Sequence, residues 1–403
     1  MESSLLYQGF SLRKQKCLCT EYKDNSIYLN VQTKSKYLRC PKCGGIDYVR
    51  NGVVVRDIQT VPIGHKRTML RTHIQKMICH DCGYIGQEHL PFVSGKRTYT
   101  NQFARFVVEL SRIGTIKDVA AFLHLSWDTV KDIQKRYLKA HFGSPSFAGV
   151  DKIGIDEFAV RKGHVYKTIV VDLDTGRIIY VGQGKGADAL NSFWKKVKRN
   201  EVNIKAVATD LSSAFIASVM EHAPRAVHVF DHFHVVKLMN DKLDDIRRKT
   251  YAAETDVNRR KVLKGSRWLL LCNGKDVMDG TYKNRLENAL DMNRDLMKAY
   301  YLKEDLIQIW LQADKRQAWK ALENWCRQAR DSKVNGLIQM ANTLLAYRYG
   351  ILAWYDIRIS TAKVEGINHK VKNMMRQAYG YRDDDFFKLK LYSLHDKISS
   401  FVG

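Results

Sequence analysis

The spacing of hydrophobic positions changes along the chain and predicts helices first and strands later. Apolar residues recur every three to four positions over residues 101–113, 115–125 and 127–142, which predicts three helices. Ser126 directly precedes the third segment and is expected to be its N-cap. Two short helices with a tight turn and basic residues on the second favour a helix-turn-helix, although an ordinary helical hairpin has the same pattern.

Beyond a linker-like stretch at residues 141–149, the hydrophobic period becomes two, which predicts strands. Three strands are expected within residues 151–184, the last two joined by a turn at Asp174-Thr175-Gly176. A helix, a strand, a second helix and a fifth strand are expected to follow at residues 187–199, 205–210, 213–223 and 226–231. This order of elements is that of an α/β ribonuclease-H-like fold.

The remaining sequence has a helical pattern. From about Asp241 to Gly336 the chain is rich in Trp, Tyr, Leu and charged residues with helical periodicity, which predicts an all-helical insertion. Two further helices are expected at residues 360–380 and 384–398. These last helices would return the chain to the α/β core.

Four of the eight cysteines form two Cys-x-x-Cys pairs, each followed by a glycine: Cys40, Cys43, Cys79 and Cys82. Two such pairs place four thiolates where they can hold one structural Zn²⁺. The alternative is four free thiols in a reducing cytoplasm. The β-rich stretch between the pairs must fold back for them to meet. For Cys17 and Cys19 a second or shared metal role is the less favoured interpretation, and Cys272 and Cys326 are expected in the helical core.

These patterns together predict a multidomain protein. It would contain a zinc-binding β-rich module, a helix-turn-helix DNA-binding domain, and an α/β ribonuclease-H-like catalytic core interrupted by an all-α insertion. The expected bounds are residues 1–95 for the zinc-binding module, 96–143 for the helix-turn-helix, 148–238 for the first part of the core, 239–338 for the insertion and 339–403 for the last helices of the core.

The charge of the chain indicates which class of molecule it binds. Lys and Arg outnumber Asp and Glu by 67 to 42, a formal net charge of +25, and the basic residues are spread along the whole length. This favours a polyanion such as nucleic acid; a membrane surface is the weaker alternative because no basic amphipathic segment flanks a hydrophobic anchor. The sequence has no long apolar run and no signal-peptide pattern at its start. We therefore expect a cytoplasmic protein that does not enter membranes.

Three acidic residues occupy positions suited to a metal-dependent active site. Alternation in the first strand of the core places Asp156 on one face and Ile153 and Glu157 on the other, and Asp210 ends the fourth strand. If those strands are neighbours, both aspartates reach one crevice, where a divalent cation would remove their repulsion. A turn or helix cap is the alternative role for Asp210. Phosphodiester chemistry with two metal ions calls for a third acid, and Glu365, at the edge of an apolar helical stripe, is the candidate, against a merely solvated helix face.

Long ordered motifs connect the chain to a known family. The cysteine module, the helix-turn-helix around "DVAAFLHLSWDTVKDI", and the stretches "GIDEFAVRKGHVYKTIVVDLDTGRII", "ATDLSSAF", "VFDHFHVVK" and "AKVEGINHKVKNMMRQAYGYRD" resemble bacterial insertion-sequence transposases of the ISL-three type over nearly the whole chain. The resemblance implies a DDE recombinase in which Asp156, Asp210 and Glu365 hold two Mg²⁺ (or Mn²⁺) ions. The family's Asp-x-x-His motif falls on Asp231 and His234. His234 is then a candidate catalytic residue that contacts the scissile phosphate or orients a carboxylate, and a structural role is the alternative.

The resemblance also implies the reaction and the partners. The reaction would be metal-dependent cleavage at the ends of a mobile element, followed by attack of the freed 3′-OH on target DNA. The partners would be double-stranded terminal inverted repeats and target DNA, bound in the bacterial nucleoid by a homodimer. A transposase-derived DNA-binding regulator without catalysis and a structure-specific nuclease with the same core fold are the two alternative functions.

Candidate DNA-binding residues lie on the second helix of the helix-turn-helix, just after the first core strand, and on the helix of Glu365. They are Asp128, Lys131, Lys135, Arg136, Arg161, Lys162, Lys372 and Arg376. On the helix-turn-helix, Val130, Ile133 and Tyr137 are expected to face the core, with Asp128, Lys131 and Lys135 outward. For Arg161 and Lys162 a solvated turn is the alternative to a phosphate contact.

Overall fold

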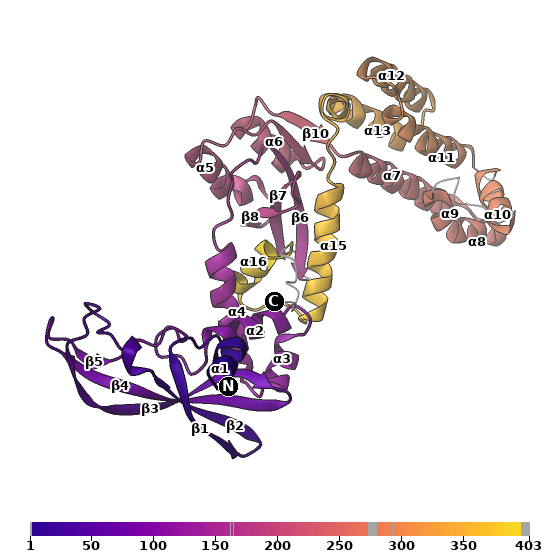
Figure 1. Cartoon of the computed structure of the whole chain (residues 1–403). Coiled ribbons are helices and arrows are strands. Elements are labelled where there is room, and N and C mark those ends of the chain that lie inside the picture. The colour runs from indigo at the N-terminus through magenta and orange to yellow at the C-terminus, as the bar shows by residue number, and fades with distance from the viewer. Residues whose placement is uncertain (1, 162, 164, 273–279, 292, 396–403) are drawn as a thin grey trace. The chain divides into compact units, whose positions relative to one another are not determined.

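The computed structural model of the chain describes residues 2–161, 163, 165–272, 280–291 and 293–395. The chain divides after Gly143 into two compact units, the second running from Ser144 to His395 (Figure 1). Within the described ranges, none of the helices is both long and apolar enough to span a membrane.

The first unit begins with a helix and a five-stranded sheet. The elements are α1 (Glu2–Phe10), β1 (Gln15–Lys23), β2 (Ser26–Thr33), the 3-10 helix η1 (Ser35–Tyr37), β3 (Tyr48–Ile63), β4 (Lys66–Cys79) and β5 (Ile85–Gln87). The strand order is β1-β2-β4-β3, with β5 paired to β4. Leu6 and Phe10 of α1 pack with Val31, Ile58 and Leu70 of the sheet. The long β3–β4 hairpin sets Tyr48 opposite Cys79, so it returns the second cysteine pair to the first, as the sequence required.

Three helices complete the first unit: α2 (Asn101–Leu110), α3 (Ile116–Phe122) and α4 (Trp127–Phe142). A capping box between Thr115 and Asp118 starts α3, and Ser126 accepts a hydrogen bond from the Thr129 amide to start α4, as predicted. The three helices share one apolar cluster that includes Phe103 and Val130. The three predicted helices are therefore present, and α4 begins and ends at the predicted residues.

The second unit contains a five-stranded mixed sheet with all five predicted strands. They are β6 (Lys152–Arg161), β7 (Val165–Asp172), β8 (Ile178–Gln183), β9 (Ala206–Thr209) and β10 (Val227–Phe230). Their order is β10-β9-β6-β7-β8; β6, β7 and β8 are antiparallel, and β9 and β10 run parallel to β6. The turn between β7 and β8 contains Gly176 with φ of +76°, a conformation that glycine adopts without strain.

Different helices cover the two faces of this sheet. On one face Ile153 and Ile155 of β6 join Phe193 and Phe215 from α5 (Asn191–Arg199) and α6 (Ser213–His222), and η2 (Ala187–Leu190) precedes α5. The other face is covered by α15 (Ala362–Gln377), which runs alongside β6 in Figure 1, and by α16 (Asp384–Tyr392). The ring of Phe387 in α16 meets Phe158 of β6 edge-on. The sheet therefore lies between two helical layers.

Every described element between β10 and α15 is helical. These are α7 (His232–Ala253), α8 (Val257–Gly265), α9 (Arg267–Leu271), α10 (Gly280–Asp291), α11 (Arg294–Leu306), η4 (Ile307–Trp310), α12 (Lys315–Asp331), α13 (Asn335–Ala346), α14 (Arg348–Leu352) and η5 (Ala353–Tyr355). Their apolar core is continuous with Phe230 of β10. Cys326 is buried in that core as predicted, but Cys272 is exposed because it caps the end of α9.

Candidate active site and zinc centre

The four predicted zinc ligands meet beside the paired ends of β3 and β4. Cys40 Sγ lies 3.6 Å from Cys82 Sγ, and Cys43 Sγ lies 3.6 Å from Cys79 Sγ. All four sulfur atoms lie within 4.8 Å of one another. A tetrahedral site with Zn–S bonds of about 2.3 Å has sulfur–sulfur distances of about 3.8 Å. The set therefore fits Zn²⁺ in the number, type and spacing of its ligands.

The backbone of each cysteine pair turns beneath the sulfur atoms. Gly44 N–H donates to Cys40 O and Gly83 N–H donates to Cys79 O. Both glycines have positive φ, +78° and +67°, which residues with a Cβ rarely adopt. Burial would raise the pKa of the Cys40 thiol, but hydrogen bonds from neighbouring backbone N–H groups, first that of Cys43, lower it to about 6. The site therefore favours a thiolate at Cys40 before any metal is considered.

In the second unit, strand register brings Asp156 and Asp210 to the same side of the sheet. In the parallel pair of β6 and β9, Gly154 lies opposite Ala208. Asp156 and Asp210 each come two residues later, and side chains two residues apart project from one face of a strand. This is the carboxyl edge at which α/β sheets bind ligands. Asp210 Oδ1 also accepts a hydrogen bond from the Ser212 amide, so the turn role proposed for Asp210 coexists with its place at this edge.

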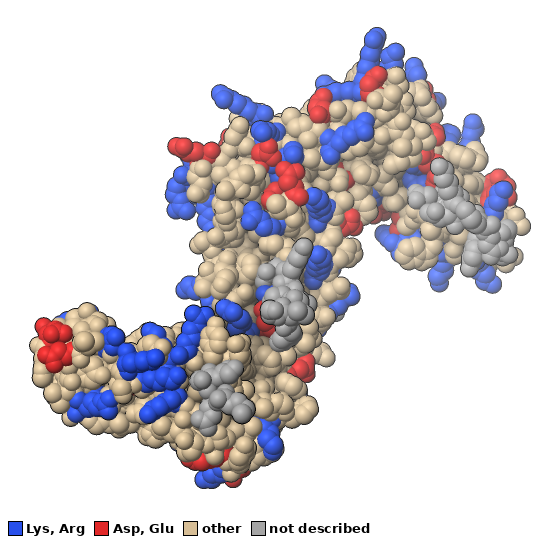
Figure 2. Space-filling model, in the orientation of Figure 1, with Lys and Arg blue, Asp and Glu red and all other residues tan. Residues whose placement is uncertain are grey.

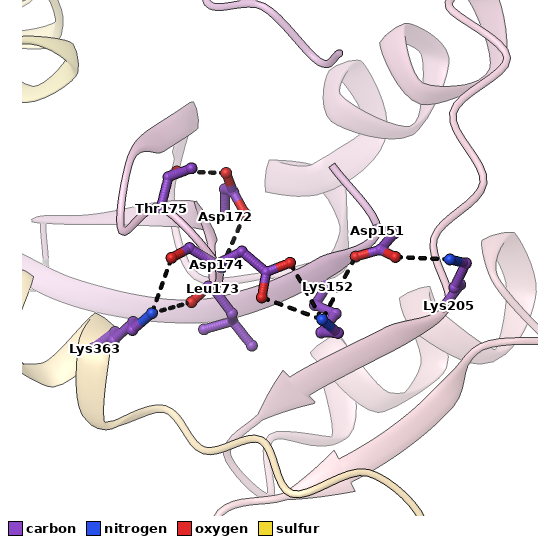
Figure 3. Close-up of polar contacts among 8 residues, drawn as sticks. All are labelled: Asp151, Lys152, Asp172, Leu173, Asp174, Thr175, Lys205 and Lys363. Carbon is purple, nitrogen blue, oxygen red and sulfur yellow. Dashed lines mark hydrogen bonds and ion pairs between the residues drawn. The ribbon is translucent and has the colours of Figure 1, made fainter. Parts of the chain in front are cut away.

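Glu365 lies in the first turn of α15, and this turn is tied to the β7–β8 turn. Lys363 Nζ donates to the backbone carbonyls of Leu173 and Asp174, at 2.5 and 3.0 Å (Figure 3). The Asp174 carboxylate in turn pairs with Lys152 at the start of β6, 3.2 Å away. These contacts link α15 to β6, the strand that carries Asp156 four residues after Lys152.

Asp231, the first residue of the predicted Asp-x-x-His pair, connects the start of α15 to the start of α7. Asp231 is buried: its Oδ1 accepts from the Phe233 amide at 3.1 Å, and its Oδ2 accepts from both N–H and Oγ1 of Thr361, the residue before α15. Both carboxylate oxygens therefore serve structural hydrogen bonds. His234 lies half-buried in the first turn of α7 with its ring edge-on to Phe233. Among the described residues, no hydrogen bond or ion pair joins His234 to the three candidate acids.

A glycine on β6 sets how closely α15 approaches the sheet. A Cβ atom at Gly154 would lie 2.5 Å from Val364 Cγ2, so a larger residue would push the helix away. Two residues further along the strand, Asp156 Oδ2 accepts a 2.7 Å hydrogen bond from Asn368 Nδ2, one helical turn after Val364. Two strand residues advance by about 6.6 Å and one helical turn by about 5.4 Å, so the two contacts occur in register. Asn368 is buried, with only 7% of its surface exposed.

The carboxylates of this pocket act on one another electrostatically. Burial, together with the negative charges of Glu157, Asp210 and Glu365, raises the pKa of Asp156 to about 7. Burial and the charge of Asp210 also raise the pKa of Glu157, a residue that strand alternation had assigned to the opposite face. The pairing of β6 with β9 ends at Gly154, so no neighbouring strand on that side separates the two faces of β6 near Asp210. Mutual repulsion of this kind is relieved by a bound divalent cation.

Two residues that hydrogen-bond to Asp156 each carry a buried oxygen with no protein hydrogen-bond partner in the described part of the chain: Glu157 Oε2 and Asn368 Oδ1. Carboxylate and amide oxygens are ligands of Mg²⁺-type cations, and unpaired buried oxygens are costly. The donor set therefore fits a hard divalent cation. Within the described ranges, only the four cysteines form a metal-ligand set with all its atoms within 4.8 Å, so the three acids lie further apart than the zinc ligands do.

On α4, the buried stripe is wider than the sequence pattern predicted. Its buried residues are Val130, Ile133, Gln134 and Leu138, with Tyr137 half-buried against the same cluster. Lys131 and Lys135 lie at the edges of this stripe and are half-buried rather than fully outward. Only part of each lysine side chain is therefore accessible to a partner.

The other candidate DNA contacts are accessible. Asp128 and Arg136 on α4, Arg161 at the end of β6, and Lys372 and Arg376 on α15 are exposed. Arg136 also forms an ion pair with Asp132 one turn earlier, and Lys162 lies outside the described residues. Lys and Arg side chains occur on both units in the face that Figure 2 shows, so positive charge is not confined to one part of the chain.

Three family models match consecutive parts of the chain. The zinc-finger of transposase IS204/IS1001/IS1096/IS1165 matches residues 36–82, which include all four cysteines of the zinc centre. The helix-turn-helix domain of transposase family ISL3 matches residues 88–138. The transposase model of the DDE class for the same family matches residues 153–391, which include Asp156, Asp210 and Glu365.

Two sequence relatives agree with these matches. The transposase for insertion sequence element IS1001 of Bordetella parapertussis is 32% identical over 97% of this chain and 96% of its own length. The transposase for insertion sequence element IS1557 of Mycobacterium tuberculosis is 24% identical over 88% of this chain and 85% of its own length. Among solved structures, the Drosophila P element transposase strand transfer complex aligns with a TM-score of 0.37 and 13% identity, covering 75% of this chain and 93% of that chain.

Proposed function

Because this chain belongs to the transposase family ISL3, we propose that it cleaves and transfers DNA strands at Asp156, Asp210 and Glu365. The observation that carries this proposal is the convergence of carboxylates from β6, from the end of β9 and from α15, whose charges act together with burial to raise the pKa of Asp156 to about 7. A structural role does not call for several acids that repel one another, whereas metal-dependent phosphodiester chemistry does.

The topology of the sheet supports a ribonuclease-H-like core. Three antiparallel strands followed by two strands parallel to the first, with helices on both faces, is the arrangement expected from the order of elements in the sequence. The helices between β10 and α15 then form an all-α insertion. The chain leaves the core after β10 and returns with α15, the helix that carries Glu365.

Each part of the chain has a defined task in this proposal. Two Mg²⁺ (or Mn²⁺) ions bound by the acids would lower the pKa of the attacking water or 3′-OH and stabilise charge on the phosphorus centre. The sheet holds Asp156 and Asp210, and the ties of Lys363 and Thr361 hold the helix of Glu365. Exposed basic residues at the end of β6 and on α15 would bind phosphates of the DNA backbone: Arg161, Lys372 and Arg376. His234, set beside the buried Asp231, would contact the same backbone.

The first unit would recognise the ends of the element. Its helix-turn-helix and zinc centre would bind double-stranded terminal inverted repeats, with Asp128, Lys131, Lys135 and Arg136 at the interface. A structural Zn²⁺ would fix the cysteine-bearing end of the β3–β4 hairpin. Cleavage of both ends of an element by one pocket per chain calls for two copies of the protein, so we propose a homodimer on DNA with target DNA as the third partner.

Glu365→Gln tests the catalytic assignment. The change keeps the size of the side chain and removes one negative charge from the metal site, so strand cleavage should fall roughly a thousand-fold or more. Binding of terminal-repeat DNA should persist, since the first unit does not contain Glu365. The assay is nicking of DNA that carries the ends of the element in Mg²⁺ or Mn²⁺, and Asp385→Asn, an exposed acid on α16, is the matched control.

The same assay separates the alternatives. Cleavage by Glu365→Gln at the wild-type rate would refute the assignment of this residue. A wild-type protein that binds the ends without nicking them in either metal would be a regulator. Cleavage that is indifferent to the end sequence would indicate a structure-specific nuclease.

A further inference from the structure

An amide side chain lies among the carboxylates of the pocket. Asn368 Nδ2 donates to Asp156 Oδ2 at 2.7 Å, and the Glu157 amide donates to Asp156 Oδ1 at 2.8 Å. Asp156 is therefore held at both oxygens, once from α15 and once from its own strand. Because Asn368 is buried, its hydrogen bond is shielded from competing water.

Asp156 needs such a restraint because its neighbours repel it. The charges of Glu157, Asp210 and Glu365 all act on it, and a carboxylate can relieve repulsion by rotating away. A lysine or arginine in place of Asn368 would hold Asp156 but would also neutralise charge that a cation needs. A neutral amide donor fixes the orientation and leaves the full negative charge of the pocket in place.

We propose that Asn368 is a positioning residue: its amide nitrogen fixes Asp156 for metal binding, and its buried Oδ1 adds a neutral oxygen to the set around the cation. Asn368 Oδ1 has no protein partner among the described residues, and amide oxygens are ordinary ligands of hard cations. The inference rests on the proposed function, because it assumes that the acids bind metal.

The test is a calorimetric titration of Mn²⁺ into the full-length, zinc-loaded chain without DNA. Asn368→Leu keeps the volume of the side chain and removes the amide, and Asn368→Ala removes it without apolar bulk. Asn373→Leu, an exposed position on the same helix, is the control. Loss of a group that orients a metal ligand weakens metal binding by about 10- to 100-fold, so both Asn368 variants should show that loss while the control binds as wild type. The metal concentration for half-maximal cleavage should rise by the same factor.

Thermal unfolding of each variant separates a folding defect from a positioning defect. A folded Asn368→Leu or Asn368→Ala protein with wild-type Mn²⁺ affinity would overturn the positioning role. Asp156→Asn measured in parallel tests the proposed function itself. If Asp156→Asn also keeps wild-type Mn²⁺ affinity, the acids are not the metal site; if Asp156→Asn loses it while the Asn368 variants do not, only the role of Asn368 is wrong.

A second, independent observation concerns the other end of α15. Tyr379 is 99% exposed and has φ of +52°, a conformation that bulky residues rarely adopt. The Gly380 amide donates to Met375 O and the Tyr379 amide donates to Arg376 O, the hydrogen-bond pattern in which the residue at position 379 is usually glycine. Tyrosine gains no packing there and strains the backbone, so the fold does not account for it.

The surroundings of Tyr379 indicate a nucleic-acid contact. Lys372 and Arg376 precede it on α15 and Arg382 follows it, all exposed, and an aromatic ring beside basic residues is the usual means of stacking on bases. We infer that Tyr379 stacks on an unstacked base of the bound DNA. This inference also rests on the proposed function.

The test places 2-aminopurine at successive positions near the cleavage site and compares its fluorescence in complexes with wild type, Tyr379→Gly and Tyr379→Trp. Tyr379→Gly should lose the position-specific quenching and bind roughly tenfold more weakly, although its unfolding midpoint should stay equal or rise by about 2 °C because the strain is gone. Tyr379→Trp should retain both the quenching and the affinity. Tyr301→Ala, at an exposed position on α11, is the control. Unchanged quenching and affinity in Tyr379→Gly would overturn the inference; failure of the wild type to bind end DNA would instead overturn the proposed function.

Discussion

The position of α15 can be perturbed without touching any acid, by changing Gly154 to alanine. The added Cβ would lie 2.5 Å from Val364 Cγ2 and 2.9 Å from Leu173 Cδ2, whereas carbon atoms in ordinary contact are about 3.5–4.0 Å apart. Leu173 can rotate aside, but valine is stiff at χ1, so α15 must move by about 1 Å. Overpacking of this kind costs about 1–3 kcal/mol of stability.

The displacement should affect cleavage more than stability. The helix carries Glu365 and Asn368, and a shift of about 1 Å in a catalytic group lowers the rate by about 100-fold. Cleavage of end DNA should therefore fall by that factor in Gly154→Ala, while binding by the helix-turn-helix stays unchanged. Gly366→Ala is the matched control, since a Cβ at Gly366 on the same helix would meet no atom within 4 Å; it should cleave normally and be slightly more stable because alanine is the better helix former.

A double-mutant cycle tests the stated cause. Val364→Ala removes the atom that clashes, so Gly154→Ala/Val364→Ala should cleave at least about tenfold faster than Gly154→Ala alone, with a coupling energy of about 1–2 kcal/mol in stability. Wild-type cleavage and unfolding midpoint in Gly154→Ala would refute the reasoning. A double variant no better than the single one would show that the glycine acts otherwise than by spacing the helix.

Three further predictions follow from the zinc centre, the helix-turn-helix and the acid pocket. Cys79→Ser should lower bound zinc from about one ion per chain to none in elemental analysis; unchanged zinc would contradict the site. Lys131→Ala and Lys135→Ala should each reduce the slope of log affinity against log salt for end DNA by about one, and two unaltered slopes would exclude this helix from the interface. The folded-state pKa of Asp156, about 7, exceeds its ordinary value of about 3.9. The folded metal-free chain therefore binds more protons than the unfolded chain between those values, and its stability should fall as pH rises through that window. Mg²⁺ should then raise the unfolding midpoint more at about pH 8 than at about pH 5, and Asp156→Asn should abolish that difference.

The sequence by itself determined the elements whose pattern is local. Short apolar or alternating runs predicted the five strands of the second unit, several of which are buried on both faces. Helical periods predicted α2, α3 and α4, because burial of one face imposes that period on a helix. Cysteine spacing predicted the zinc ligands for a similar reason: each pair is a local turn, and only the return of the β3–β4 hairpin was needed. The sequence pattern did not predict strand β1, because almost all of its residues are exposed.

The tertiary structure decided which groups share the acid pocket. Asp156 and Asn368 are 212 residues apart in the chain, and Lys363 and Leu173 are 190 residues apart. A local pattern of apolar and polar residues contains no information about such pairs. The sequence therefore predicted no role for Asn368, and strand alternation placed Glu157 on the opposite face from Asp156. Both belong to the pocket because Gly154 lets α15 close on β6 and because β6 continues past its pairing with β9. The sequence specifies the burial of these side chains and their proximity to the acids only through the whole fold.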